Sequence, residues 1–243
     1  MKFSCVKEYL ERFLAVAERF TGKNLTLPIL ANVLLEVKSN EISITSTNLE
    51  YAFEVKFPGR GGKDGKVCVP AKILNSLIQS FKGNNVELEE KQGNLFIRSD
   101  LRESRINGMS PDDFPLIPKI KKTASVSIDA VSLKNGLEKL LPAVSSSEFK
   151  PELTGIYFSF TPSGAHLAAT DTFRLAEQTL PLKAKESAGF SFILPHRVSL
   201  EVSRVLSDIE KIEVSIGDNQ ALFEADGMRI ISRLIEGNFP EYS

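Results

Sequence analysis

Side chains that could do chemistry are few and widely spaced in this sequence. The two histidines, His166 and His196, are 30 positions apart (196 − 166) and belong to no HExxH pattern, so a metal site is not indicated. The adjacent carboxylates Asp112 and Asp113 are typical of a solvated turn rather than of acid–base catalysis. The glycine-rich residues 59–65 lack the GxxxxGK(S/T) pattern of a phosphate loop and are interpreted as a mobile hairpin loop. We therefore expect no enzyme activity, no metal and no cofactor.

A stripe of basic and amide side chains is a stronger candidate for a functional site than these residues, because such side chains can bind phosphates. Residues 71–81 have the periodicity of an amphipathic helix. Its apolar face is predicted to hold Ile73, Leu74, Leu77, Ile78 and Phe81. The opposite stripe holds Lys72, Asn75, Gln79 and Lys82 and no carboxylate. Because the net charge of the chain is only −1, any nucleic-acid surface must be local, and this stripe is a candidate.

A second predicted helix, residues 197–209, has a more mixed polar side. Arg197 and Arg204 lie on it, but Glu201 and Asp208 are expected to weaken the positive field. For an isolated helix, a solvated polar face is the alternative interpretation, and the recurrence of basic residues on the second helix of each unit favours a binding role.

The elements that must position these helices form a long internal repeat. Pro70 recurs as Pro195 and Pro115 recurs as Pro240, and both pairs are 125 positions apart (195 − 70 and 240 − 115). A strand and an amphipathic helix open each unit, and a second helix follows each of Pro70 and Pro195. The chain is therefore expected to contain the same arrangement twice.

Short segments with alternating apolar residues predict antiparallel hairpins in both units. The expected strands include residues 33–37, 41–45, 86–90 and 95–99, and then 154–160, 165–169, 212–216 and 221–225. We predict an α+β fold of two repeated domains, each with two helices packed on antiparallel sheet. The predicted domains are residues 1–118 and 124–243, joined by the charged linker 119–123.

The sequence gives no sign of secretion or membrane insertion. Charges interrupt the apolar residues of the first eleven positions, and no stretch approaches the roughly 20 apolar residues of a membrane span. Cys5 and Cys68 are too few for a disulfide framework and are expected to be small buried residues in a reducing compartment. We therefore expect a cytoplasmic protein.

Four short motifs carry a resemblance to a known family. They are LPILAN at residues 27–32, TSTNLE at 45–50, ATDTFRLA at 169–176 and GNFPEY at 237–242. The first two resemble the opening domain, and the last two the central domain, of the bacterial DNA polymerase III beta subunit, a sliding clamp. The resemblance implies the DNA clamp fold and a processivity factor. In this family a head-to-tail dimer forms a six-domain ring around duplex DNA and tethers the replicative polymerase.

The helix stripes and the resemblance together give two sets of site residues. Those expected to contact DNA are Lys23, Asn24, Lys72, Gln79, Lys82, Lys150, Arg197 and Arg204. The resemblance also implies a hydrophobic pocket for short linear motifs of the polymerase, the clamp loader and repair proteins. Its expected residues are Leu153, Thr170, Thr172, Phe173, Arg174, Leu175 and Pro240. Asp171 beside Arg174 is expected to form a structural ion pair.

The chain holds two of the three repeats expected of this family. We interpret it as truncated, so that it lacks one half of the head-to-tail contact and is expected to be monomeric. Two alternatives stay open. One is a natural two-domain clamp that closes as a trimer, as archaeal and eukaryotic clamps do, and the other is an α+β hydrolase or transferase, for which we find no catalytic constellation.

Overall fold

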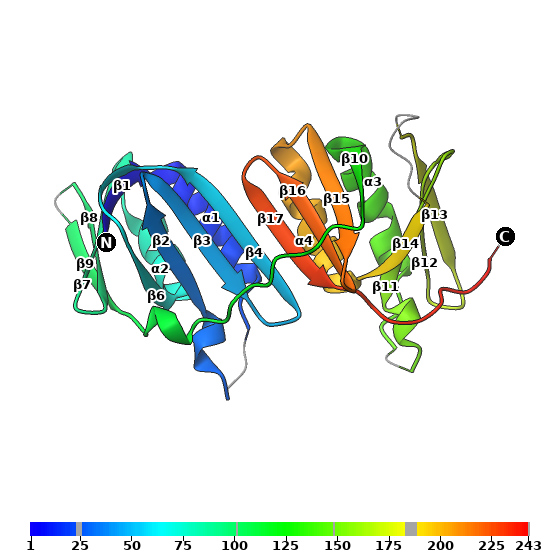
Figure 1. Cartoon of the computed structure of the whole chain (residues 1–243), viewed down its shortest axis with the longest axis horizontal. Helices are drawn as coiled ribbons and strands as arrows, with labels where there is room; N and C mark the ends of the chain where they lie inside the picture. The colour runs from blue at the N-terminus through cyan, green and yellow to red at the C-terminus, as the bar shows by residue number, and fades with distance from the viewer. Residues whose placement is uncertain (23–25, 101, 148, 183–188, 243) are drawn as a thin grey trace. The chain divides into compact units, whose positions relative to one another are not determined.

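The computed structural model describes residues 1–22, 26–100, 102–147, 149–182 and 189–242 (Figure 1). It divides into two compact units, unit 1 (Met1–Ile117) and unit 2 (Pro118–Ser243). In its described part, each unit contains two α-helices and antiparallel strands. The predicted α+β class is therefore confirmed.

Unit 1 forms two antiparallel sheets. Its strands are β1 (Lys2–Val6), β2 (Asn32–Lys38), β3 (Glu41–Thr47), β4 (Tyr51–Pro58), β5 (Arg60–Lys63), β6 (Gly65–Pro70), β7 (Asn85–Lys91), β8 (Asn94–Ser99) and β9 (Arg102–Asn107). One sheet has the order β5-β1-β7-β8-β9 and the other has the order β4-β3-β2-β6. The helices are α1 (Lys7–Arg19) and α2 (Ala71–Ser80).

Unit 2 repeats this plan. Its strands are β10 (Ala124–Asp129), β11 (Gly155–Thr161), β12 (Gly164–Thr170), β13 (Leu175–Leu180), β14 (Phe190–Pro195), β15 (Lys211–Gly217), β16 (Gln220–Ala225) and β17 (Met228–Arg233). They form the orders β13-β12-β11-β14 and β10-β15-β16-β17. The helices are α3 (Ala130–Leu140) and α4 (His196–Val205).

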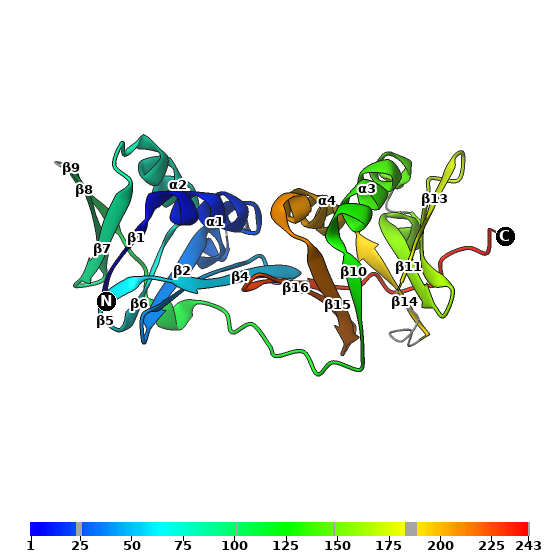
Figure 2. The ribbon, with the colours of Figure 1, turned by 90° about the horizontal axis from the view of Figure 1, so that it is seen from above.

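In each unit the two helices lie together and bury an apolar stripe against the strands (Figure 2). In α1 the stripe includes Leu10 and Leu14, which are one turn apart and fully buried. In α3 it includes Leu133, Leu137 and Leu140. Each buried leucine stabilises the fold by about 1.5–3 kcal/mol relative to an exposed one, so these stripes fix the helices on the sheets.

The second helix of each unit begins directly after a proline. Pro70 ends β6 and Pro195 ends β14, and both have extended backbones (φ −57°, ψ 117° and φ −54°, ψ 141°). The predicted helix at residues 71–81 is observed as α2. The one predicted at residues 197–209 is observed as α4, followed by the 3-10 turn Leu206–Asp208.

The interpretation of residues 59–65 as a mobile loop is wrong. Arg60–Lys63 is strand β5, which pairs with β1 and places Gly61 opposite Phe3. On the other side of β5, the carbonyl of Asn40 accepts from the Gly59 amide (2.9 Å) and its side-chain oxygen accepts from the Gly61 amide (3.2 Å). The strand depends on partners distant in sequence, which a local glycine pattern does not reveal.

Cys5 and Cys68 are buried and form no disulfide. Burial raises the pKa of each thiol to about 12, so neither is a reactive thiolate at neutral pH. The expectation that they are structural residues is confirmed.

Candidate functional site

The polar face of α2 presents basic side chains to solvent. Lys72, Gln79 and Lys82 are exposed, and Lys82 lies two positions beyond the last helical residue, Ser80. Within the described ranges, no carboxylate forms an ion pair with either lysine. The positive charge of this face is therefore available to an external anion.

Two residues of α2 do not lie where the periodicity placed them. Asn75, predicted on the exposed stripe, is only 8% exposed, because its Nδ2 donates to Glu18 Oε2 of α1 (2.7 Å). Ile73, predicted on the apolar face, is 51% exposed. The buried face is centred on Leu74 and Ile78, so the packing of α1 against α2 turns the helix slightly from the predicted orientation.

The polar face of α4 is organised around a buried carboxylate. Glu201 is 0% exposed, and its Oε1 lies 2.8 Å from Arg204 Nη1 and 3.9 Å from Arg197 Nε. A buried carboxylate is costly unless it is paired, so these arginines stabilise it. The pairing agrees with the expectation that Glu201 weakens the positive field of this helix, although its burial was not predicted. Both arginines remain exposed on their outer sides.

The candidate residues of the two helices match position for position. Lys72 and Arg197 are each the second residue of their helix, and Gln79 and Arg204 are each the ninth. The position of Glu201 corresponds to Ser76, which is exposed. The two helices thus project polar side chains at the same positions. In α4 these side chains pair with a buried carboxylate, whereas α2 has an exposed serine at the carboxylate's position.

The remaining residues predicted to contact DNA lie elsewhere. Lys23 and Asn24 fall outside the described residues. Lys150 is exposed and precedes the 3-10 turn Pro151–Leu153.

A second candidate surface lies on the face of the β13-β12-β11-β14 sheet opposite to the helices. Thr170 is paired with Leu175, and the register of β11 with β12 places Gly155 beside Thr170. Leu175 is 48% exposed, whereas Leu153, two positions before Gly155, is buried. The row Gly155, Thr170 and Leu175 is named the groove floor here. Gly155 is buried, and a Cβ there would lie 2.8 Å from Ile235 Cδ1, so only the end of the row at Thr170 and Leu175 is accessible.

The turn at residues 170–174 brings together most of the residues predicted for peptide binding. Asp171 Oδ1 accepts hydrogen bonds from the amides of Phe173 (3.0 Å) and Arg174 (2.9 Å), and Thr170 Oγ1 donates to the Arg174 carbonyl (2.8 Å). Thr172 has a φ of 77°, which tightens the turn. Phe173 is 96% exposed, so its ring is available to a partner.

The predicted ion pair is confirmed, since Arg174 Nε lies 2.8 Å from Asp171 Oδ2. The pKa of the Asp171 carboxyl is lowered, chiefly by the hydrogen bond from the Arg174 amide and further by the Phe173 amide and the Arg174 guanidinium. The carboxylate is thus a structural part of this turn and not a catalytic acid.

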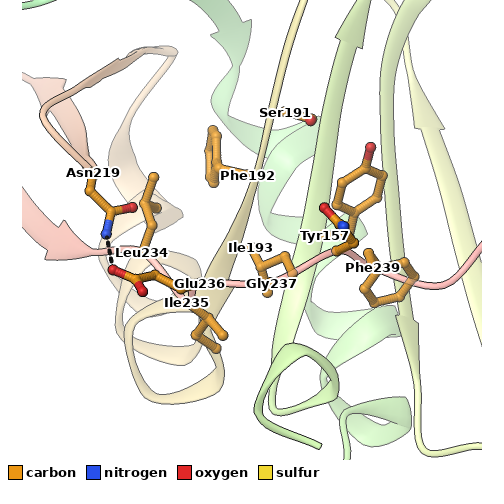
Figure 3. A pocket seen from close by; sticks show the side chains of 11 residues that line it. Tyr157, Ser191, Phe192, Ile193, Asn219, Leu234, Ile235, Glu236, Gly237 and Phe239 are labelled. Carbon is orange, nitrogen blue, oxygen red and sulfur yellow. Dashed lines mark hydrogen bonds between the residues drawn. The ribbon is translucent and has the colours of Figure 1, made fainter.

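Pro240 belongs to a segment that sequence reasoning treated only as the end of a repeat. This crossing segment (residues 234–242) passes over the same face of the sheet (Figure 3). The Phe239 ring stacks on Tyr157, with centroids 5.0 Å apart and planes 7° from parallel. Pro240 is exposed immediately after this stack.

A cavity of about 390 Å³ lies between the crossing segment and the sheet (Figure 3). Its walls include Tyr157, Ser191, Asn219 and Glu236. Tyr157 was missed as a functional candidate because it lies in an ordinary alternating strand, and only the fold places Phe239 on it.

Comparisons with known proteins match both parts of the chain to the same family. The family model described as DNA polymerase III beta subunit, N-terminal domain, matches residues 1–118, and the model described as its central domain matches residues 127–241. A beta sliding clamp of Staphylococcus epidermidis is 30% identical over 251 aligned positions, which cover 99% of this chain and 66% of that protein. The chain thus spans about two thirds of the length of this relative.

Solved structures give the same result. The DNA polymerase sliding clamp of Bacillus subtilis matches with a TM-score of 0.91 and 27% identity over 99% of this chain and 66% of its own. A sliding clamp of Pseudomonas aeruginosa bound to griselimycin has the same fold, with a TM-score of 0.91 and 21% identity over 100% of this chain and 66% of its own. Among the described helices, none is long and apolar enough to span a bilayer.

Proposed function

Because the chain belongs to the DNA polymerase III beta subunit family, we propose that it acts in DNA replication as part of a sliding clamp. In this role it contacts duplex DNA without reading its sequence and binds linear motifs of the replicative polymerase, the clamp loader and repair proteins. The function is non-enzymatic and cytoplasmic. The matching family models favour this bacterial clamp over a trimeric two-domain clamp and over an α+β enzyme.

The observation that carries the DNA part of the proposal is the repeated placement of polar side chains on α2 and α4. Lys72 and Arg197 occupy one helix position, and Gln79 and Arg204 occupy another. One lysine and one amide on α2, and two guanidinium groups on α4, are too few for base readout but suit phosphate contact. A clamp needs such weak contacts, because tight readout would stop it from sliding.

The support for peptide binding is the groove on unit 2. Leu175 and Phe173, two positions apart, are both exposed, and the strand row next to Leu175 carries the stack of Tyr157 and Phe239 that precedes the exposed Pro240. Apolar side chains beside fixed polar groups are what an extended peptide needs for anchoring and orientation. A sliding clamp of Pseudomonas aeruginosa was solved with griselimycin bound, and we use that compound as the probe and assign it to this groove as part of the proposal.

The DNA part is tested by the anisotropy of two fluorescent duplexes of unrelated sequence, measured over a range of salt concentrations. Lys72→Glu and Arg197→Glu should each weaken binding and lower the salt slope by about 0.9, the contribution of one phosphate contact. Lys38→Glu and Lys211→Glu are matched controls, because both lysines are exposed and lie at the ends of strands. Equal losses for test and control variants would refute the assignment of these helices.

The peptide part is tested by titrating griselimycin against the wild-type chain and Leu175→Ala. Loss of the leucine side chain should weaken binding about tenfold, since it removes roughly 1.5 kcal/mol or more of apolar burial. Leu49→Ala, at an exposed leucine of unit 1, is the control. Equal affinity of Leu175→Ala and the wild type would reject the groove.

A further inference from the structure

The crossing segment follows one row of residues across the sheet of unit 2. The strand registers align Ile193, Tyr157, Ala168 and Glu177 in this order on the face opposite to the helices. The Ile235 amide donates to the Ile193 carbonyl (3.0 Å) at the start of the row.

Further along the row, aromatic side chains hold the segment. Phe239 stacks on Tyr157, and the ring of Tyr242 meets Phe239 edge to face, with centroids 5.9 Å apart. At the far end of the row, burial and the nearby Glu177 carboxylate raise the pKa of Tyr242. The segment is thus attached at β14 and at β11, and Tyr242 extends it toward Glu177 of β13.

This row is the direct neighbour of the groove floor. Tyr157 and Glu177 are each two positions along their strands from the floor residues Gly155 and Leu175. Two positions on a strand correspond to about 6.6 Å, the width of one side chain. The crossing segment therefore runs along the edge of the groove, with Pro240 exposed between its two aromatic anchors.

The start of the segment is held by hydrogen bonds: the Leu234 amide donates to the Asn219 carbonyl (3.1 Å), and Asn219 Nδ2 donates to Glu236 Oε1 (3.0 Å). Residues 234–239 also line the cavity of about 390 Å³. Before the stack, Gly237 has a φ of 134° and passes so close to Glu152 that a Cβ would lie 3.2 Å from the Glu152 Cβ. Beyond that close passage, the position of Pro240 is set mainly by the rings on either side of it.

We propose that Tyr157 and Glu177 are positioning residues that hold Phe239 and Tyr242, and through them Pro240, as one wall of the peptide groove. The inference rests on the proposed peptide-binding function. The partner is an extended peptide whose apolar side chain enters between Leu175 and Pro240. Neither Tyr157 nor Glu177 needs to touch this partner.

The test uses griselimycin as the probe and the whole chain with three variants. Tyr157→Ala removes the surface on which Phe239 stacks and should weaken binding about two- to tenfold, the range that an aromatic pair contributes. Tyr157→Phe keeps the ring and should bind like the wild type. Ser159→Ala, one row further from the groove on the same face, is the control and should also bind like the wild type.

A second readout reports the crossing segment itself. Absorbance titration of the tyrosines should show that Glu177→Gln and Tyr157→Ala bring the pKa of Tyr242 closer to its ordinary value of about 10, whereas Ser159→Ala should not. Circular dichroism of each variant verifies that unit 2 is folded.

The outcomes separate the inference from the function on which it rests. If the wild type does not bind griselimycin, the peptide-binding function is rejected. If the wild type binds and Leu175→Ala does not, but Tyr157→Ala binds as well as the wild type, the groove stands and the positioning role is overturned.

Discussion

The turns at residues 47–51 of unit 1 and 170–174 of unit 2 share their hydrogen bonds and backbone angles, but they differ in the burial of their side chains. In unit 1, Asn48 Oδ1 accepts from the amides of Glu50 (3.0 Å) and Tyr51 (2.9 Å), as Asp171 Oδ1 does from the corresponding amides of unit 2. Leu49 even has the same positive φ, 78°, as its counterpart, at 77°.

The side chains at these hydrogen-bonded positions differ in burial. Tyr51 is half-buried and packs edge to face on Phe20, with centroids 5.5 Å apart. Its counterpart in the repeat, Arg174, is exposed, and Phe173 and Leu175 beside it are exposed as well. The repeat supplies the same turn in both units, but the residue that closes it is half-buried in unit 1 and exposed in unit 2.

The helices α2 and α4 differ in a related way. Lys72 of α2 and Lys82 beyond its end form no ion pair with a carboxylate in the described part of the chain, whereas the arginines of α4 share the buried Glu201. A paired guanidinium keeps a fixed direction, while an ammonium group on a free stem samples many. We infer that unit 2 holds its polar side chains more rigidly at both of its surfaces.

The largest effect is expected from removing the ion pair of Arg204 with Glu201 in α4. Arg204→Ala removes the closer partner of a fully buried carboxylate and should lower the free energy of unfolding by about 3 kcal/mol. Gln79→Ala, at the same helix position of α2, should change it by less than about 0.5 kcal/mol. Urea unfolding followed by circular dichroism measures both, and similar values for the two variants would remove the distinction.

A smaller effect is expected from the two turns. Asp171→Ala removes the acceptor of two amides and should weaken griselimycin binding about fivefold, the factor that one net hydrogen bond contributes. Asp171→Asn keeps an acceptor, as Asn48 does in unit 1, and should bind nearly as well as the wild type. Asn48→Ala should leave binding unchanged in a calorimetric titration. If it weakens binding as much as Asp171→Ala does, the groove is not confined to unit 2.

The smallest effect concerns pH. The folded-state pKa of Asp171 is lowered from the ordinary value of 3.8, so the carboxylate stabilises its turn fully above pH 3.8, and this contribution is lost as the pH falls through the lowered pKa. The amide signals of Phe173 and Arg174 should therefore shift in acid, while those of Glu50 and Tyr51 should not follow this titration. Asp171→Asn should abolish the shift. A titration of Phe173 that survives this substitution would contradict the assignment.

Much of the fold follows from local patterns. The spacing of Pro70 and Pro195 revealed the repeat, and apolar periodicity located α2 to within one residue at its end. These features depend on neighbours along the chain, which is why they could be predicted. The ion pair of Asp171 with Arg174, three residues apart, was predictable for the same reason.

What could not be predicted depends on contacts between distant segments. Asn75 is polar and lies on a polar stripe, yet Glu18 of another helix draws it into the interior. Glu201 looks like a surface carboxylate until its burial on α4 is known. Tyr157 gains its proposed role only because Phe239, 82 positions later (239 − 157), stacks on it.

The proposed sliding-clamp role is tested most directly by mapping duplex DNA onto the chain by amide NMR at low salt. Two duplexes of unrelated sequence should perturb the same amides on both α2 and α4, around Lys72, Gln79, Arg197 and Arg204, and added salt should reverse the shifts. Perturbations confined to one helix, absent from both, or different for the two sequences would contradict the account.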